Sequence, residues 1–263
     1  MTAKPPQSSS KPNIVPLRTP TGPTRLAGKL ALITGGSKGI GYAIARALAT
    51  EGANVVITGR DLNTLTKSAA ELRKEVLGPA KILAMTCDVR TPQSVARLFA
   101  VVKRRFEQID ILVNNAGISQ PPASLLGTSL ETWRANIETN LTGVFLCTRA
   151  ALPQMKEGAT IINNLSAAAK QLFPQYYAYT AAKMGALGFT QSLREELAPR
   201  GIRVMALLPG ATSTDIWQQI MPNAPRDHML AVESIAQAVL YAVLLPPNVN
   251  PTEISLDPTS GAL

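Results

Sequence analysis

Cysteine and histidine are scarce in this chain of 263 residues, which contains two cysteines and one histidine. Cys87 and Cys147 lie far apart, with neither a CxxC pair nor a histidine beside them. This scarcity argues against a disulfide framework and against a zinc site. We therefore expect no bound metal, two cysteines that pack in the core, and a surface position for His228.

Long hydrophobic runs are also missing, although 46% of the residues are apolar. No stretch reaches the roughly 18 uncharged apolar residues that would indicate a membrane span. The first residues also lack the hydrophobic core of a signal peptide. We therefore expect a cytoplasmic protein without a membrane partner, and the apolar content suits one large domain.

Acidic residues are missing before Glu51, and five lysines and arginines lie within residues 1–29. The formal net charge of +9 could indicate a nucleic-acid partner. The first residues are rich in Pro, Ser and Thr, however, and we predict that residues 1–28 form a disordered basic arm. Removing five charges from +9 leaves +4, which a phosphate-rich ligand explains, so we expect no nucleic-acid partner. The alternative, a nucleic-acid-binding arm, predicts loss of salt-sensitive affinity when the arm is deleted.

Short apolar segments alternate with segments of helical periodicity from residue 29 onward. Strands that are apolar on both faces and separated by helices form parallel sheets covered on both sides. The sequence therefore predicts an α/β, doubly wound Rossmann fold with a single seven-stranded parallel sheet and helices on both faces, in one domain over residues 29–263. The predicted strands are 29–34, 53–58, 81–86, 110–115, 159–166, 202–209 and 253–258.

Glycines and polar residues gather where six of the predicted strands end. In chain order these clusters are TGGSKGIG, GRD, CDV, NNAG, NLS and PGATST. Ligands of open parallel sheets bind beyond the carboxyl ends of the strands. The six clusters therefore predict one binding site at that edge.

The cluster TGGSKGIG follows the first predicted strand and precedes a helix. Glycines allow a close approach that a Cβ would block, and the helix start offers free N–H groups and a positive dipole end to an anion. A pyrophosphate is the ligand that this turn suits, although an ordinary strand-to-helix turn is the alternative reading. The candidate cofactor-binding residues here are Gly35, Ser37, Lys38, Gly39, Ile40 and Gly41.

The end of the second predicted strand bears on the choice of dinucleotide. An acidic residue there would bind the ribose hydroxyls of NAD, whereas a basic one would pair with the 2′-phosphate of NADP. This chain has Arg60 at that place, and Lys38 could approach the same phosphate from the glycine turn. We therefore predict NADP(H) in preference to NAD(H). Two solvated surface cations are the alternative, which Asp61 beside Arg60 keeps open.

A reaction is indicated by Tyr179 and Lys183, which lie four residues apart on a predicted helix and so share one face. A tyrosine hydroxyl has a pKa of about 10 and is a poor base at neutral pH. A nearby cation favours the phenolate, and the pair can then protonate an alkoxide or deprotonate an alcohol. Taken alone, this spacing is common and usually means two exposed helix residues.

With these motifs together, the sequence resembles the classical short-chain dehydrogenase/reductase (SDR) family, in particular its 3-oxoacyl-(acyl-carrier-protein) reductase-like members. TGGSKGIG is similar to the cofactor turn of that family, and NNAG is similar to its fourth-strand motif. Ser166, Tyr179 and Lys183 match its catalytic residues, and Asn140 in NLTG matches the asparagine that completes its tetrad.

The resemblance implies a role for each of these residues. Tyr179 would be the general acid/base, Lys183 would lower its pKa and hold the nicotinamide ribose, Ser166 would bind the substrate oxygen, and Asn140 would hold a water beside Lys183. A further set of residues would contact the cofactor beyond the third, fourth and sixth strands: Asp88, Val89, Asn115, Ala116, Gly117, Pro209, Gly210, Thr212 and Thr214.

The segments that could line a substrate cleft carry apolar and aromatic side chains with few charges. They favour an uncharged or hydrophobic ketone or secondary alcohol, with a 3-oxoacyl group as one candidate. The ending NVNPTEISLDPTSGAL departs from the glycine-rich ending of the 3-oxoacyl reductases and puts the acyl-carrier substrate in doubt. The expected lining residues are Leu125, Leu126, Leu172, Phe173, Tyr176, Trp217, Ile220 and Met221.

The resemblance also implies a homo-oligomer, either a tetramer or a dimer, with the helix over residues 184–197 as a contact face. The main alternative from another class is a non-catalytic NADP(H)-binding sensor or scaffold protein. A broken tetrad would be the mark of such a protein, whereas this chain has all four residues.

Overall fold

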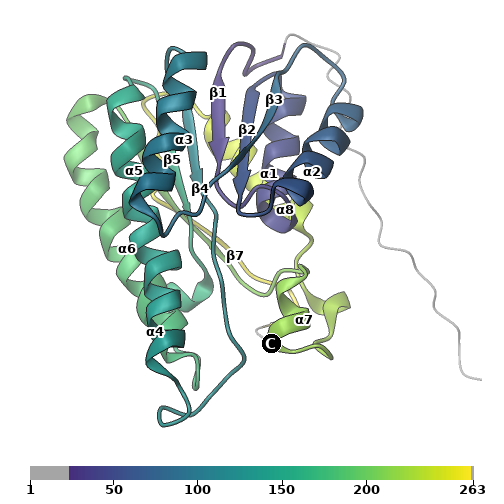
Figure 1. Cartoon of the computed structure of the whole chain (residues 1–263), viewed down its shortest axis with the longest axis vertical. Coiled ribbons are helices and arrows are strands. Elements are labelled where there is room, and N and C mark those ends of the chain that lie inside the picture. The colour runs from purple at the N-terminus through teal and green to yellow at the C-terminus, as the bar shows by residue number, and fades with distance from the viewer. Residues whose placement is uncertain (1–23, 262–263) are drawn as a thin grey trace, which may run out of the picture.

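The computed structural model describes residues 24–261. Within that range the centre is a sheet of seven parallel strands in the order β3-β2-β1-β4-β5-β6-β7, with helices on both faces (Figure 1). The predicted doubly wound Rossmann fold is therefore confirmed. The strands are β1 (Leu30–Ile33), β2 (Asn54–Gly59), β3 (Ile82–Thr86), β4 (Ile111–Asn114), β5 (Thr160–Asn164), β6 (Arg203–Pro209) and β7 (Glu253–Leu256).

Two groups of helices cover the two faces of the sheet (Figure 1). On one face lie α1 (Gly39–Thr50), α2 (Leu62–Glu75) and α8 (Val232–Leu244), and on the other lie α3 (Pro92–Arg105), α5 (Gly143–Ala151) and α6 (Tyr177–Leu197). Two shorter helices, α4 (Leu130–Ile137) and α7 (Ile216–Ile220), follow β4 and β6 in the chain, and a π-helical turn (Glu138–Thr142) joins α4 to α5.

The central strands β1, β4, β5 and β6 are buried at every position, and in β1 the side chains alternate between the two cores. In β1, Ala31 and Ile33 pack with α1 and α8, whereas Leu30 and Leu32 pack with α3 and α6. All four side chains are almost fully buried. Such period-two alternation fixes the register, because a slip of one residue would turn every side chain to the opposite face.

Both cysteines lie in the core, as predicted. Cys87 follows β3 and Cys147 lies on α5, and both pack in the apolar layer beneath α3 and α6. Burial raises the pKa of each thiol above its ordinary value.

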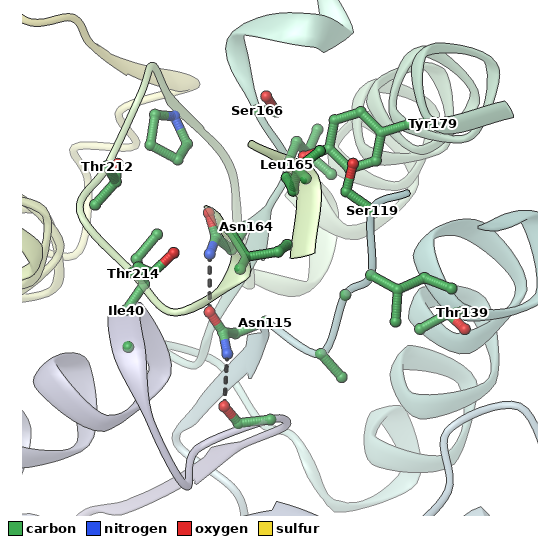
Figure 2. Close-up of a pocket in the computed structure, with 18 of the residues that line it drawn as sticks. Ile40, Asn115, Ser119, Thr139, Asn164, Leu165, Ser166, Tyr179, Thr212 and Thr214 are labelled. Carbon is green, nitrogen blue, oxygen red and sulfur yellow. Dashed lines mark hydrogen bonds between the residues drawn. The ribbon is translucent and has the colours of Figure 1, made fainter. Parts of the chain in front are cut away.

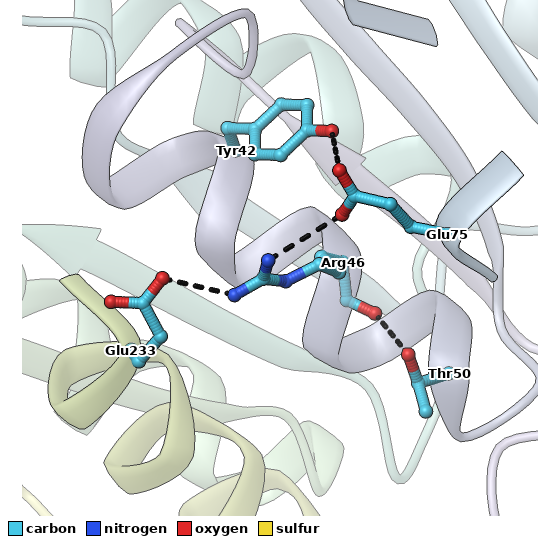
Figure 3. Close-up of polar contacts among 5 residues, drawn as sticks. All are labelled: Tyr42, Arg46, Thr50, Glu75 and Glu233. Carbon is cyan, nitrogen blue, oxygen red and sulfur yellow. Dashed lines mark hydrogen bonds and ion pairs between the residues drawn. The ribbon is translucent and has the colours of Figure 1, made fainter. Parts of the chain in front are cut away.

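A set of polar contacts joins the three helices on the opposite face (Figure 3). Arg46 on α1 donates to Glu75 at the end of α2 and to Glu233 at the start of α8, at 3.4 and 3.0 Å. The Tyr42 hydroxyl also donates to Glu75, at 3.1 Å. These contacts hold α1 against its neighbours, and the start of α1 carries the glycine turn.

The folded body begins before residue 29, where the predicted arm over residues 1–28 was expected to give way to it. Residues 1–23 lie outside the described part of the chain, but residues 24–28 belong to the folded body. Leu26 is 6% exposed and packs in the core, and the Arg25 guanidinium donates two hydrogen bonds to the Glu51 carboxylate, at 2.7 and 3.0 Å. The burial of Leu26 and the Arg25–Glu51 ion pair therefore attach residues 24–28 to the folded body, although no sequence pattern predicts it.

Candidate active site

A cavity of about 1000 Å³ lies at the carboxyl ends of the strands, where the sequence places the binding site. Figure 2 shows part of its wall, which draws residues from the glycine turn, from the ends of β4 and β5, from α6 and from the segment after β6. Every candidate catalytic or cofactor-binding residue from the sequence lines this cavity except Gly41 and Asn140. The six clusters of the sequence therefore meet at one place.

The glycine turn offers its backbone to the cavity. Gly35 and Gly39 have positive φ angles of 62° and 57°, which glycine adopts without strain. A Cβ at Gly35 would lie 2.9 Å from the Cα of Ala116, so the turn packs directly on the segment after β4. No side chain caps the first turn of α1, and no acidic residue lies there. Its N–H groups thus remain available to an anion.

Gly41 was expected to line the cofactor site, but it does not line the cavity. A Cβ at Gly41 would lie 2.3 Å from Nδ2 of Asn115 and 2.5 Å from the carbonyl oxygen of Gly35. That amide nitrogen donates to the carbonyl oxygens of Thr34 and Gly35, at 2.9 Å each. Gly41 therefore makes room for the Asn115 side chain rather than for a ligand.

Basic side chains flank the end of the cavity beyond β2. Arg60 is exposed and lines the cavity, and Lys38 Nζ lies 3.6 Å from the carboxylate of Asp215, with both side chains largely exposed. The carboxylate of Asp61 caps α2 by accepting from the backbone and the hydroxyl of Thr64, and these bonds lower its pKa. The Asp61 carboxylate is thus hydrogen-bonded to the first turn of α2 and forms no ion pair with Arg60, which is the cation at the end of β2.

Asp88 follows β3 and also lines the cavity, together with Val89. Its carboxylate accepts from the Arg90 guanidinium, with a shortest distance of 2.6 Å, and this hydrogen bonding holds its pKa below the ordinary value. An ionised acceptor is therefore present at this wall of the cavity.

Ser166, Tyr179 and Lys183 come together on the opposite wall (Figure 2 labels the first two). Tyr179 is half-buried, whereas Lys183 is only 5% exposed. The Lys183 ammonium lies 5.5 Å from the centre of the Tyr179 ring and donates to the backbone carbonyl of Asn164, at 3.1 Å. The Ser166 hydroxyl accepts from the backbone of Ala168, at 3.1 Å. The spacing of four residues on α6 thus places the side chains of Tyr179 and Lys183 in the same cavity wall.

The electrostatics of Tyr179 differ from the prediction that Lys183 lowers its pKa. Burial raises the pKa of the Tyr179 hydroxyl, and a hydrogen bond with Ser166 opposes the rise. Burial also lowers the pKa of Lys183, to about 8. The physical reason is that the same dry wall disfavours both charged forms, the phenolate and the ammonium.

Asn140 lies behind this wall, in the π-helical turn between α4 and α5. Its side-chain amide donates to the carbonyl of Ile118 at 2.9 Å and accepts from the N–H of the same residue at 3.1 Å. A Cβ on Gly117 would lie 3.0 Å from the Asn140 side-chain oxygen and 3.7 Å from Lys183 Nζ. Asn140 therefore holds the loop after β4 in place beside the lysine.

The segment after β6 closes the cavity from the other side. Thr212 donates to the carbonyl of Gly210 at 3.0 Å, and the indole of Trp217 donates to the carbonyl of Thr212 at 2.8 Å. A Cβ at Gly210 would lie 2.6 Å from a carboxylate oxygen of Asp257. Pro209, Gly210, Thr212 and Thr214 line the cavity as expected, and the chain after β7 reaches it as well.

The expected substrate-lining residues divide into two groups. Phe173, Tyr176, Trp217, Ile220 and Met221 line the cavity as predicted. The prediction is wrong for the three leucines, which lie outside it and face solvent: Leu125, Leu126 and Leu172 are 68%, 100% and 80% exposed. Apolar character alone cannot tell a lining residue from an exposed loop tip.

Several residues of the cavity wall were not among the candidate site residues from the sequence, and Asn164 and Asp257 are two of them. Asn164 ends β5 and is the first residue of the NLS cluster, so its membership of that cluster was the available signal. Asp257 depends on the course of the C-terminal segment, which no motif indicates. Among residues 24–261 no group of three histidine, cysteine or acidic side chains could hold a metal ion, and no described helix is both long and apolar enough to cross a membrane.

The fold is that of a doubly wound, Rossmann-type α/β protein, and the cavity lies at the edge of the sheet where ligands of such proteins bind. A family model described as short chain dehydrogenase matches residues 29–225. The chain therefore belongs to the short-chain dehydrogenase family and is an oxidoreductase of that family.

Relatives of the chain agree with this assignment. A 3-oxoacyl-[acyl-carrier-protein] reductase from Synechocystis is 39% identical over 75% of this chain and 79% of its own. The structure of an alcohol dehydrogenase from Thermococcus sibiricus, complexed with 5-hydroxy-NADP, aligns with a TM-score of 0.80 at 32% identity over 87% of this chain and 95% of its own. The structure of a 3-ketoacyl-(acyl-carrier-protein) reductase from Brucella melitensis, complexed with NADH, aligns with a TM-score of 0.79 at 31% identity. The alignment covers 88% of this chain and 98% of that reductase.

Because the Lys183 ammonium is buried, the free energy of unfolding should depend on pH. Its pKa is lowered from 10.5 to about 8 in the folded protein, so the unfolded chain binds more protons between these values and the free energy of unfolding rises with pH across that window. Relative to Lys183→Met, the wild type should gain on the order of 3 kcal/mol between pH 8 and pH 10.5. Urea unfolding of both proteins at several pH values measures the difference, and a difference that stays constant with pH would contradict the burial of a titrating lysine.

Proposed function

We propose that the protein is an NADP(H)-dependent reductase that transfers hydride between the nicotinamide and a ketone or secondary alcohol, with Tyr179 as the general acid/base. One observation carries this proposal: Ser166, Tyr179 and Lys183 share a wall of the cavity whose other end is the glycine turn. The neighbours bound to NADP and NADH support a dinucleotide in that cavity.

The residues of this chain suit such a cofactor. The free start of α1 suits the pyrophosphate, and Arg60 and Lys38 suit a 2′-phosphate. When bound, the cofactor supplies the hydride. A raised pKa keeps the proton on Tyr179 at neutral pH, which is the form that protonates the oxygen of a carbonyl as it is reduced. Ser166 holds that oxygen beside the tyrosine.

The test is the consumption of NADPH, with NADH in parallel, across a panel of ketones, quinones, sugars and 3-oxoacyl thioesters. The reductase proposal predicts that at least one carbonyl is reduced. The alternative, a non-catalytic NADP(H)-binding sensor or scaffold, predicts tight binding of NADPH without turnover of any of them.

The preference for NADPH over NADH should depend on the two cations beyond β2. Replacement of Arg60 and Lys38 by glutamine should lower the NADPH:NADH ratio of kcat/KM about ten- to a hundredfold, because charge-assisted hydrogen bonds to the 2′-phosphate are lost. Lys103→Gln, which removes an exposed cation from α3, is the matched control. An unchanged ratio in the double variant would refute the assignment of these two residues.

The substrate side of the cavity favours an uncharged or hydrophobic carbonyl, because aromatic residues and Ile220 and Met221 line it. A 3-oxoacyl group remains one candidate, as the Synechocystis relative suggests. Product analysis after the panel assay identifies the preferred class.

We also propose a cytoplasmic homo-oligomer, a tetramer or a dimer, that contacts through α5 and α6. Phe145 on α5 is 41% exposed and meets Phe189 on α6 edge to face, with 6.2 Å between the ring centres. Exposed aromatic residues of this kind are common at subunit contacts. Sedimentation velocity measures the state directly.

A further inference from the structure

Asn164, the last residue of β5, joins the two halves of the cavity (Figure 2). It is 8% exposed and lines the wall. Its side-chain nitrogen donates to the side-chain oxygen of Asn115 at 2.8 Å. Its backbone carbonyl accepts from Lys183 Nζ at 3.1 Å. One residue therefore contacts both the segment after β4 and the lysine of the opposite wall.

Asn115 continues this connection into the glycine turn. Its side-chain nitrogen donates to the carbonyl oxygens of Thr34 and Gly35, at 2.9 Å each. The space around that nitrogen is closed, because a Cβ at Gly41 would lie 2.3 Å from it. The Asn115 amide thus has one available position, and it fixes the carbonyls that begin the turn.

The direction of both amides follows from the chemistry of their partners. Carbonyl oxygens only accept hydrogen bonds, so the Asn115 side chain must point its NH₂ group at Thr34 and Gly35 and its oxygen at Asn164. Asn164 must then donate to that oxygen. Its own side-chain oxygen is left buried without a partner. The Asn164 side chain is therefore held by the single bond from its nitrogen to Asn115, while its oxygen makes no hydrogen bond.

We propose that Asn164 is a positioning residue that sets the glycine turn relative to Lys183 by acting through Asn115. The proposal depends on the proposed function, since it assumes that the turn binds NADPH. Loss of the Asn164 side-chain amide frees Asn115 to move, and with it the Thr34 and Gly35 carbonyls on which the turn is built. The backbone contact of Lys183 remains, because every residue at position 164 supplies a carbonyl.

The neighbouring Asn163 provides a matched control on the same strand. It is fully buried and does not line the cavity. Its side chain accepts from Asn114 at 2.8 Å and donates to the Thr190 hydroxyl at 2.9 Å. Its replacement removes two side-chain hydrogen bonds, one more than that of Asn164, and neither of them leads to the turn. It therefore separates a loss of stability from a loss of positioning.

The experiment measures the dissociation constant of NADPH by fluorescence titration, together with the melting temperature. Asn164→Leu should raise the constant about tenfold, while the KM for the carbonyl substrate stays unchanged. Asn163→Leu should lower the melting temperature and leave the constant near the wild-type value. Asn164→Ser, whose hydroxyl is too short to reach Asn115, gives a second and milder variant that should behave as Asn164→Leu does.

A double-mutant cycle with Asn115→Ala completes the test. Because Asn164 acts through Asn115, Asn164→Leu should cause no further loss of NADPH affinity in the Asn115→Ala background. Wild-type affinity in both Asn164 variants, or full additivity with Asn115→Ala, would overturn the proposal. Failure of the wild type to bind NADPH would instead refute the proposed function, so the two failures can be told apart.

Discussion

Tyr179→Phe should lose turnover by a factor on the order of 10² to 10⁴, the usual contribution of a general acid, and should bind NADPH as tightly as the wild type. Phenylalanine keeps the ring in the cavity wall and removes only the hydroxyl. The developing alkoxide then loses the hydroxyl that protonates it, and the Lys183 ammonium is directed to the carbonyl of Asn164 instead. Single-turnover kinetics with the best carbonyl of the panel measure the loss.

Tyr177→Phe is the control for this prediction. Tyr177 lies two residues before Tyr179 on α6, is 41% exposed, and does not line the cavity. The Tyr177→Phe variant should therefore retain wild-type turnover. If Tyr179→Phe kept more than about a fifth of the wild-type rate, another group would have to supply the proton.

Arg203→Met should lower the free energy of unfolding by roughly 2 to 4 kcal/mol. Arg203 begins β6, is 7% exposed, and donates to four backbone carbonyls at the end of α8 and in the loop after it: Ala242, Val243, Leu245 and Val249, at 2.9 to 3.4 Å. No intrahelical donor remains for the last carbonyls of a helix. Methionine fills much of the same volume but leaves these acceptors without a donor.

Equilibrium unfolding in urea measures this effect. Arg200→Met is a useful comparison, since Arg200 is exposed and donates to the carbonyls of Leu152 and Met155 at only 3.4 and 3.3 Å. It should cost less than about 1 kcal/mol. Equal effects of the two substitutions would mean that the carbonyls at the end of α8 find water instead.

The fold could be predicted from the sequence because its signal repeats along the whole chain. Each central strand contains a short apolar run, and each is separated from the next by helical periodicity. The predicted strand 53–58 corresponds to β2, Asn54–Gly59, and the other six agree about as closely. The site clusters could be located for the same reason, since parallel strands bring their carboxyl ends to one edge.

Other features depend on contacts that a sequence does not display. Whether Leu172 lines the cavity or faces solvent is decided by the path of a loop, and the pKa of Tyr179 is decided by how dry its surroundings are. Leu26 is buried in the core next to α1, and its backbone N–H donates to the carbonyl of Glu51 after that helix. Asn164 is a polar residue at the end of a strand, and only the position of Asn115 gives it significance.

Deuterium transfer tests the central claim most directly. The wild type would be incubated with the panel of carbonyls and NADPH deuterated at both transferable positions of the nicotinamide ring, and the products analysed by mass spectrometry. The account predicts one deuterium per product molecule, on the carbon that becomes the alcohol carbon. NADPH that binds tightly while no carbonyl is reduced, or a product without deuterium, would contradict it.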